Sequence, residues 1–108
     1  MNKAELTEWV AKQAKLSKKD AYEAVEATLE AIAHHVSQGD EVRLTGFGTF
    51  WAKPRRASQR INPQTRQKIS VGAKVVPSFR PGSELKERIY KRLKVTEVGG
   101  KLQIKPSR

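Results

Sequence analysis

The chain has 108 residues, of which 37% are hydrophobic, and its 22 Lys or Arg against 11 Asp or Glu give a formal net charge of +11. This length indicates one domain with a small core, and the charge favours a polyanion, above all nucleic acid, as the partner. The sequence has no Cys, which excludes disulfides, thiol nucleophiles and thiolate metal sites.

The positive charge is concentrated in the later part of the chain. Residues 1–40 hold five Lys against seven Asp or Glu, whereas residues 53–80 hold eight Lys or Arg and no acid. The opening "MNKAELTEWV" lacks the apolar segment of a signal peptide, and no apolar run suits a membrane span. We therefore expect a cytoplasmic protein whose polyanion site lies after residue 40.

The first 40 residues predict two helices. Asn2 is a suitable N-cap, and apolar residues at helical spacing continue to about Lys15. Ser17 begins a second capping pattern, and a long amphipathic stretch follows until Gly39. The two helices are expected to form a hairpin with one shared apolar side.

From residue 41 the apolar period changes to two, which predicts strands. The segment "TGFG" at residues 45–48 indicates a turn, in which Gly46 and Gly48 permit positive φ or close backbone approach. A strand then resumes with Phe50.

Between Thr49 and Val76 the sequence predicts two mostly polar strands joined at Asn62-Pro63. Strands of ~11 residues at about 3.4 Å per residue would carry the tip roughly 35 Å from the core, which makes this segment an arm. Pro54 cannot donate to a strand ladder, so we expect an irregularity there.

If alternation holds along this arm, Trp51, Lys53 and Arg55 share one face. The aromatic ring of Trp51, next to Phe50, is interpreted as local packing.

The last part of the chain predicts a helix and a tail. Phe79 is an apolar anchor, Pro81-Gly82 breaks the strand, and Ser83 is expected to cap a helix that ends near residue 92. In residues 93–108, "KVTEV" and "KLQIK" flank two glycines, the loop length of a tight hairpin, in which Val95 would oppose Ile104 and Glu97 would oppose Leu102. A flexible basic tail is the alternative.

Several segments together resemble one family. "MNKAELTEWV", "LSKKDA", "GDEVRLTGFGTF", "INPQT" and "VPSFRPGSELKERI" are similar, in order and without gaps, to the HU and integration host factor group of bacterial DNA-bending proteins. The resemblance covers residues 1–92 and implies an α+β fold in an intertwined dimer, with a helical base, a β-sheet saddle and two extended β-ribbon arms. It divides the chain into residues 1–40, 41–80 and 81–92, with 93–108 as an extension.

The resemblance also implies a function. Proteins of this group are minor-groove architectural proteins that insert apolar wedges between base steps, so the chain is expected to bind, bend and compact double-stranded DNA in the nucleoid, largely without sequence specificity. Pro63 matches the intercalating wedge. The positions implied to contact DNA are Lys3, Thr45, Gly46, Gly48, Lys53, Arg55, Arg56, Arg60, Ile61, Asn62, Pro63, Gln64, Thr65, Arg66, Lys68, Lys74, Arg80 and Lys86. The dimer core is expected to contain Leu29, Ile32, Leu44, Phe47, Phe50 and Phe79.

The arm departs from the family pattern at three positions. Arg60 stands where the family usually has Gly, Ile61 where it has Arg, and Arg66 where a Gly follows "NPQT". The loss of a Gly predicts a turn that is stiffer or of another type. Ile61 is expected either to widen the wedge or to pack on sugar edges.

No nucleophile, phosphate-binding loop, cofactor motif or metal constellation is recognisable, so we expect no enzyme, no cofactor and no small-molecule substrate. His34 and His35 are adjacent and point about 100° apart on a helix, which does not suit paired metal ligands. Two alternatives to a homodimeric, sequence-tolerant protein are a site-preferring subunit like integration host factor, paired with itself or a paralogue, and a dimeric scaffold whose tail binds a protein.

Overall fold

The computed structural model describes residues 1–107 and divides the chain into two compact units, Met1–Asp40 and a second that begins at Glu41. The helices and strands follow one another as α1 Lys3–Ala14, α2 Lys18–Ser37, β1 Val42–Leu44, β2 Gly48–Arg55, β3 Ser58–Ile61, β4 Lys68–Val71, β5 Lys74–Pro81, α3 Ser83–Arg92, β6 Leu93–Val98 and β7 Lys101–Pro106. Among the described residues, no helix is both long and apolar enough to cross a membrane.

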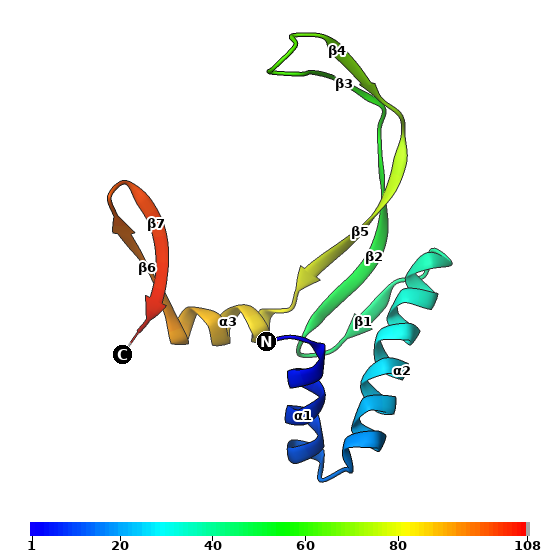
Figure 1. Ribbon diagram of the computed structural model, residues 1–108, viewed down its shortest axis with the longest axis vertical. Coiled ribbons are helices and arrows are strands. Elements are labelled where there is room, and N and C mark those ends of the chain that lie inside the picture. Colours follow the sequence, from blue (N-terminus) through cyan, green and yellow to red (C-terminus); the bar gives the residue numbers. More distant parts are fainter. Residues whose placement is uncertain (108) are drawn as a thin grey trace. The chain divides into compact units, whose positions relative to one another are not determined.

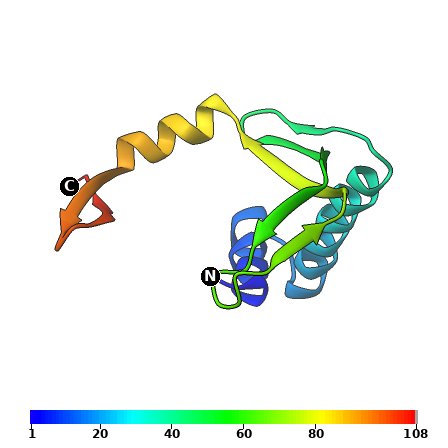
Figure 2. The same cartoon turned by 90° about the horizontal axis from the view of Figure 1, so that it is seen from above.

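The first unit is a pair of helices, α1 and α2, that lie side by side (Figures 1 and 2). The Asn2 side chain accepts the amide of Glu5 at 2.9 Å, and the Ser17 hydroxyl accepts the amide of Asp20 at 3.1 Å, so both predicted caps are confirmed. Lys15 ends α1 in the left-handed region at φ 56°.

Small side chains hold this pair together. Ala21 is fully buried, and Ala11 and Val25 are each 8% exposed. The larger apolar residues of the same unit are more open, with Trp9 55% and Leu29 45% exposed. The apolar side predicted for the helix hairpin is therefore present but largely uncovered within one chain.

The second unit contains a three-stranded antiparallel sheet in the order β1-β2-β5. Val42 pairs with Phe50, and Phe50 pairs with Phe79 in turn. The Phe50 and Phe79 ring centroids are 4.6 Å apart, and the Phe47 and Phe79 centroids are 5.6 Å apart. These three rings form the aromatic cluster of the unit.

Both glycines of the β1–β2 turn are used as the sequence predicts. Gly46 has φ +85°, a conformation that side-chain-bearing residues rarely adopt. A Cβ on Gly48 would lie 2.6 Å from the carbonyl oxygen of Arg80, too close for any side chain. Gly48 thus allows β5 to lie against the start of β2.

The arm consists of two consecutive two-stranded ribbons (Figure 1). Pairing of β2 with β5 runs unbroken to Arg55 opposite Lys74, and β3 pairs with β4 from Ser58 opposite Val71 onward. The ladder is interrupted between them, at residues 56–57 on one side and 72–73 on the other.

The prediction of an irregularity at Pro54 is wrong, because Pro54 pairs in register with Val75. The interruption of the ladder lies further along the chain, at residues 56–57. The pairing of β1 with β2 extends only as far as Phe50, so β2 has an open edge beyond that residue. A proline whose nitrogen faces an open edge removes no ladder hydrogen bond.

The third helix begins one residue earlier than predicted. Gly82 is the N-cap, with extended backbone at φ −77° and ψ 165°, and no side chain caps the helix, so the prediction for Ser83 is wrong. The Gly82 amide donates to the Phe47 carbonyl at 2.8 Å, and its carbonyl accepts from Lys86 at 3.1 Å. This backbone link to the β1–β2 turn fixes where the helix starts.

A two-stranded hairpin, β6–β7, follows α3 directly, as the paired glycines predict. Gly99 and Gly100 have φ of 60° and 82°, the positive values of a type I′ turn. Val95 pairs with Ile104, and the Ser107 amide donates to the Arg92 carbonyl at 2.9 Å. The hairpin is therefore linked back to the end of α3, while residue 108 of the predicted tail lies outside the described residues.

Candidate nucleic-acid interface

The three-stranded sheet separates charge from apolar surface. Alternation along β2 places Lys53 and Arg55 on the face of Thr49, and the pairing register with β1 and β5 adds Arg43, Lys74 and Arg80 to that face. Every charged residue of these three strands lies on that face, which we call the basic face. The opposite face carries Val42, Leu44, Gly48, Phe50, Ala52, Pro54, Val75, Pro77, Phe79 and Pro81.

Trp51 belongs to the basic face together with Lys53 and Arg55, as alternation predicts. The Arg80 guanidinium carbon lies 5.3 Å from the centroid of the Trp51 ring, which is a cation–π arrangement. The packing expected for Trp51 is therefore against Arg80, on the opposite side of the sheet from Phe50. The indole holds this guanidinium at the root of the arm.

Arg43 is a member of the basic face that the sequence analysis missed. In the sequence its charge is cancelled by Glu41, and the two side chains do form an ion pair at 3.0 Å. Arg43 pairs with Thr49, however, and this register carries it onto the same face as Lys53. The sequence signal for the position of Arg43 is the length of the "TGFG" turn, because that length sets which residues of β1 and β2 lie on the same face.

The tip is a loop fixed by hydrogen bonds to Asn62. Its side-chain oxygen accepts the Gln64 amide at 2.9 Å, and its carbonyl accepts the Arg66 amide at 2.7 Å. Its own amide donates to the Gln67 carbonyl at 2.9 Å. Pro63 therefore sits, exposed, in a loop whose shape is set by its neighbour. Thr65 adds a long contact of 3.4 Å from the Gln67 amide to its hydroxyl.

Arg66 keeps the backbone conformation that a glycine would favour. Its φ is 58°, in the left-handed region, where a side chain costs about 1–2 kcal/mol. The loss of Gly at this position is therefore accommodated by strain at one residue.

Arg60 and Ile61 lie on opposite faces of the β3–β4 ribbon. Arg60 pairs with Ile69, and Ile61 pairs with Lys68, so each face carries one cation and one isoleucine. The Ile61 side chain is 67% exposed next to Pro63. Its roles in widening the wedge or in packing on sugar edges both stay predictions. Arg56 lies in the interruption between the two ribbons.

The expected flank positions are spread over other elements. Thr45 and Gly46 are exposed in the β1–β2 turn, where the Glu84 carboxylate reaches to 2.9 Å from where a Gly46 Cβ would be. Lys86 is exposed on α3. Lys3 belongs to the first unit, and a hydrogen bond to Glu26, together with the attraction of that charge, raises the pKa of its ammonium.

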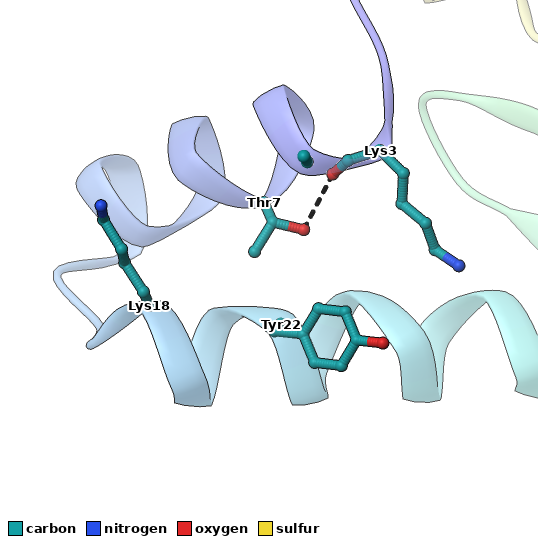
Figure 3. A pocket seen from close by; sticks show the side chains of 5 residues that line it. Lys3, Thr7, Lys18 and Tyr22 are labelled. Atoms are coloured by element: carbon teal, nitrogen blue, oxygen red, sulfur yellow. Dashed lines mark hydrogen bonds between the residues drawn. The ribbon is translucent and has the colours of Figure 1, made fainter.

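A hollow of about 490 Å³ lies between α1 and α2 in the first unit (Figure 3). Tyr22 faces Thr7 across it, Lys3 and Lys18 stand at its two ends, and the Thr7 hydroxyl donates to the Lys3 carbonyl at 2.9 Å. Only Lys3 of these residues was predicted to contact DNA. Among residues 1–107, no group of His, Asp or Glu is arranged to hold a metal ion.

The residues predicted for a dimer core are partly exposed in the single chain. Phe47, Phe79 and Leu29 are 47%, 41% and 45% exposed, and Ile32, Leu44 and Phe50 are half-buried. These side chains belong to both units, and one chain leaves each of them at least partly uncovered.

The model of the family described as bacterial DNA-binding protein matches residues 1–90. The chain belongs to this family. It is 45% identical over 89 residues to the DNA-binding protein HU-1 of Halalkalibacterium halodurans, covering 82% of this chain and 99% of that protein. It is 43% identical to the DNA-binding protein HU 1 of Bacillus subtilis, with 82% and 97% covered.

Solved structures give the same result. The Anabaena HU–DNA cocrystal structure superposes with a TM-score of 0.78 at 42% identity, covering 82% of this chain and 97% of that one. HU from Thermotoga maritima gives a TM-score of 0.58 at 34% identity, with 82% and 98% covered. The predicted HU-like α+β fold and family are confirmed, and the family is one of histone-like DNA-binding proteins and not of enzymes. The family match ends at residue 90, before the β6–β7 hairpin.

Proposed function

We propose that the chain is an architectural protein that binds double-stranded DNA largely without sequence specificity, and that bends and compacts it in the nucleoid. The observation that carries this proposal is the one-sided charge of the β1-β2-β5 sheet, whose basic face leads directly into the arm. Phosphate contacts of this kind supply affinity and position a protein without reading sequence. The family to which the chain belongs supports the same partner.

Pro63 is the wedge in this proposal. Insertion of an apolar group between base steps costs a few kcal/mol, which contacts of the bent duplex with the protein offset. A proline has no amide proton to leave unsatisfied in the stack, and its φ is already fixed. The hydrogen bonds around Asn62 hold the loop in shape before DNA arrives, so less ordering is required on binding.

The active form is a homodimer, in which the uncovered apolar residues of each chain are buried against the other. Phe47, Phe79 and Leu29 supply the exposed surface that this association removes from water. Two chains provide two arms, one on each side of the bend. The cations of the arm then meet phosphates on both flanks of each kink, where Arg suits a narrow minor groove.

Bending is tested by end-to-end energy transfer on a duplex of a few tens of base pairs. We expect Pro63→Ala to keep most of the affinity and to lose most of the bend, while Pro63→Leu, which restores an apolar wedge, recovers it. Equal bending by the native chain and Pro63→Ala would show that the wedge is wrong. Random competitor DNA at about 0.15 M salt distinguishes a site-preferring protein, because sequence-tolerant binding gives a specificity ratio near one.

A further inference from the structure

The β6–β7 hairpin also separates its residues onto two faces. Its register places Lys94, Lys101 and Lys105 on one face, which we call the lysine face, with Thr96, Val98 and Gln103. The other face carries Leu93, Val95, Glu97, Leu102, Ile104 and Pro106. The one acid of the hairpin, Glu97, is thus on the opposite side from all three lysines.

Two of these lysines directly face each other. Lys94 pairs with Lys105, and like charges at directly opposite positions of an antiparallel pair destabilise it. Within residues 93–107 neither side chain has an ion-pair partner, whereas Lys91, on α3 just before the hairpin, is paired with Glu87 at 3.4 Å. An ordinary solvated hairpin gains nothing from this repulsion, but an anion bound on the lysine face removes it.

The positions of the charges match an extended anion better than a single phosphate. Lys101 and Lys105 are four residues apart on β7, which corresponds to about 13 Å along the strand. Duplex DNA offers one negative charge for every ~1.7 Å of its axis, so a backbone can meet all three ammonium groups at once.

We propose that the lysine face of the β6–β7 hairpin is a second contact with the DNA backbone, outside the part of the chain that the family match covers. This inference rests on the proposed function, because it assumes that the same duplex is held by the basic face and the arm. The hairpin lengthens the DNA that one protein covers and adds affinity without adding sequence preference.

The test compares two triple variants that lose the same charge. One is Lys94→Gln, Lys101→Gln and Lys105→Gln; the matched control changes the exposed Lys12, Lys15 and Lys19 of the first unit to Gln. Affinity for a duplex is measured at several salt concentrations, and the protected length is measured by footprinting.

We expect the tail variant to bind roughly tenfold more weakly, to protect a shorter stretch, and to lose about 0.9 from its salt slope for each phosphate contact removed. The control should stay within about twofold of the native chain. Equal losses in both variants, which would indicate net charge alone, or no loss in the tail variant would overturn the proposal.

Two further measurements test whether the lysines cause the loss of affinity, as opposed to the apolar face or an unfolded hairpin. Leu102→Ser keeps every lysine and should keep the native salt slope. If it lost as much duplex affinity as the triple variant, the lysine face would not be the cause of that loss. Cross-strand NMR contacts between Val95 and Ile104 verify that the triple variant still forms the hairpin. If the native chain itself does not bind duplex DNA, the proposed function fails, whereas native binding and bending with an unchanged tail variant rejects this inference alone.

Discussion

The arm ribbon, β3–β4, and the tail ribbon, β6–β7, are both short antiparallel pairs, yet they distribute charge differently. In the arm, each face has one cation and one isoleucine, because Arg60 pairs with Ile69 and Ile61 with Lys68. In the tail, all three lysines lie on one face. A ribbon that enters a groove meets DNA on both of its sides, whereas a ribbon that lies on the outside of a duplex meets it on one.

The turns of the two ribbons also differ. The tail reverses direction with two glycines, which adopt positive φ without steric cost. The arm uses a six-residue loop held by Asn62 and keeps the strained Arg66 at φ 58°. At the tip, which is expected to contact DNA, the charged Arg66 thus occupies a backbone conformation that glycine would adopt with less strain.

The largest expected effect is the loss of duplex affinity when two charges are removed from the arm ribbon, compared with the removal of two charges from the tail ribbon. We expect Arg60→Gln with Lys68→Gln to weaken duplex binding by roughly a hundredfold at low salt, because both faces of the arm lose their cation inside the groove. Lys94→Gln with Lys105→Gln, which removes two of the three tail lysines, should weaken binding by less than about tenfold. Salt titrations of both double variants check this, and equal losses would remove the distinction between the ribbons.

A smaller effect is expected from Lys94→Glu, which converts the like-charge pair with Lys105 into an opposite-charge pair. The tail hairpin should become more stable by about 0.5 kcal/mol, because cross-strand charge pairs contribute on that scale. DNA affinity should fall at the same time. Amide hydrogen exchange in β6 and β7 measures the first change, and a hairpin that becomes less protected would contradict the proposed repulsion.

The smallest effect is expected at Arg66. Arg66→Gly removes the left-handed strain, but the extra chain entropy of glycine offsets most of the gain, so the arm tip should be stabilised by less than about 0.5 kcal/mol. Arg60→Gly is the matched control, since it removes the same charge from a strand and should destabilise the tip. Hydrogen exchange at Asn62 and Gln67 reports both, and stabilisation by both variants would mean that charge and not backbone strain is responsible.

Much of the fold could be predicted because its signals are local. The caps at Asn2 and Ser17, the turn at Gly46 and the Gly99-Gly100 hairpin each depend on residues only a few positions apart. Alternation likewise placed Trp51 correctly on the face of Lys53 and Arg55.

The errors arose where distant segments decide the outcome. Gly82 and not Ser83 caps α3 because the Phe47 carbonyl, 35 positions earlier, holds its amide. Pro54 is tolerated because β1 is too short to reach it. Arg43 joined the basic face only through its pairing with Thr49, which a tally of neighbouring charges could not show.

The interruption between the β2–β5 and β3–β4 ladders separates the arm into two cooperative segments. The outer ladder has only four residue pairs, from Ser58 opposite Val71 to Ile61 opposite Lys68, and it can open while the inner ladder stays paired. In the proposed complex with DNA, release then proceeds in steps, with the tip leaving first while the basic face remains bound. A competing duplex can occupy the vacated tip before departure is complete, so the residence time of the protein on DNA should shorten as free DNA becomes more abundant.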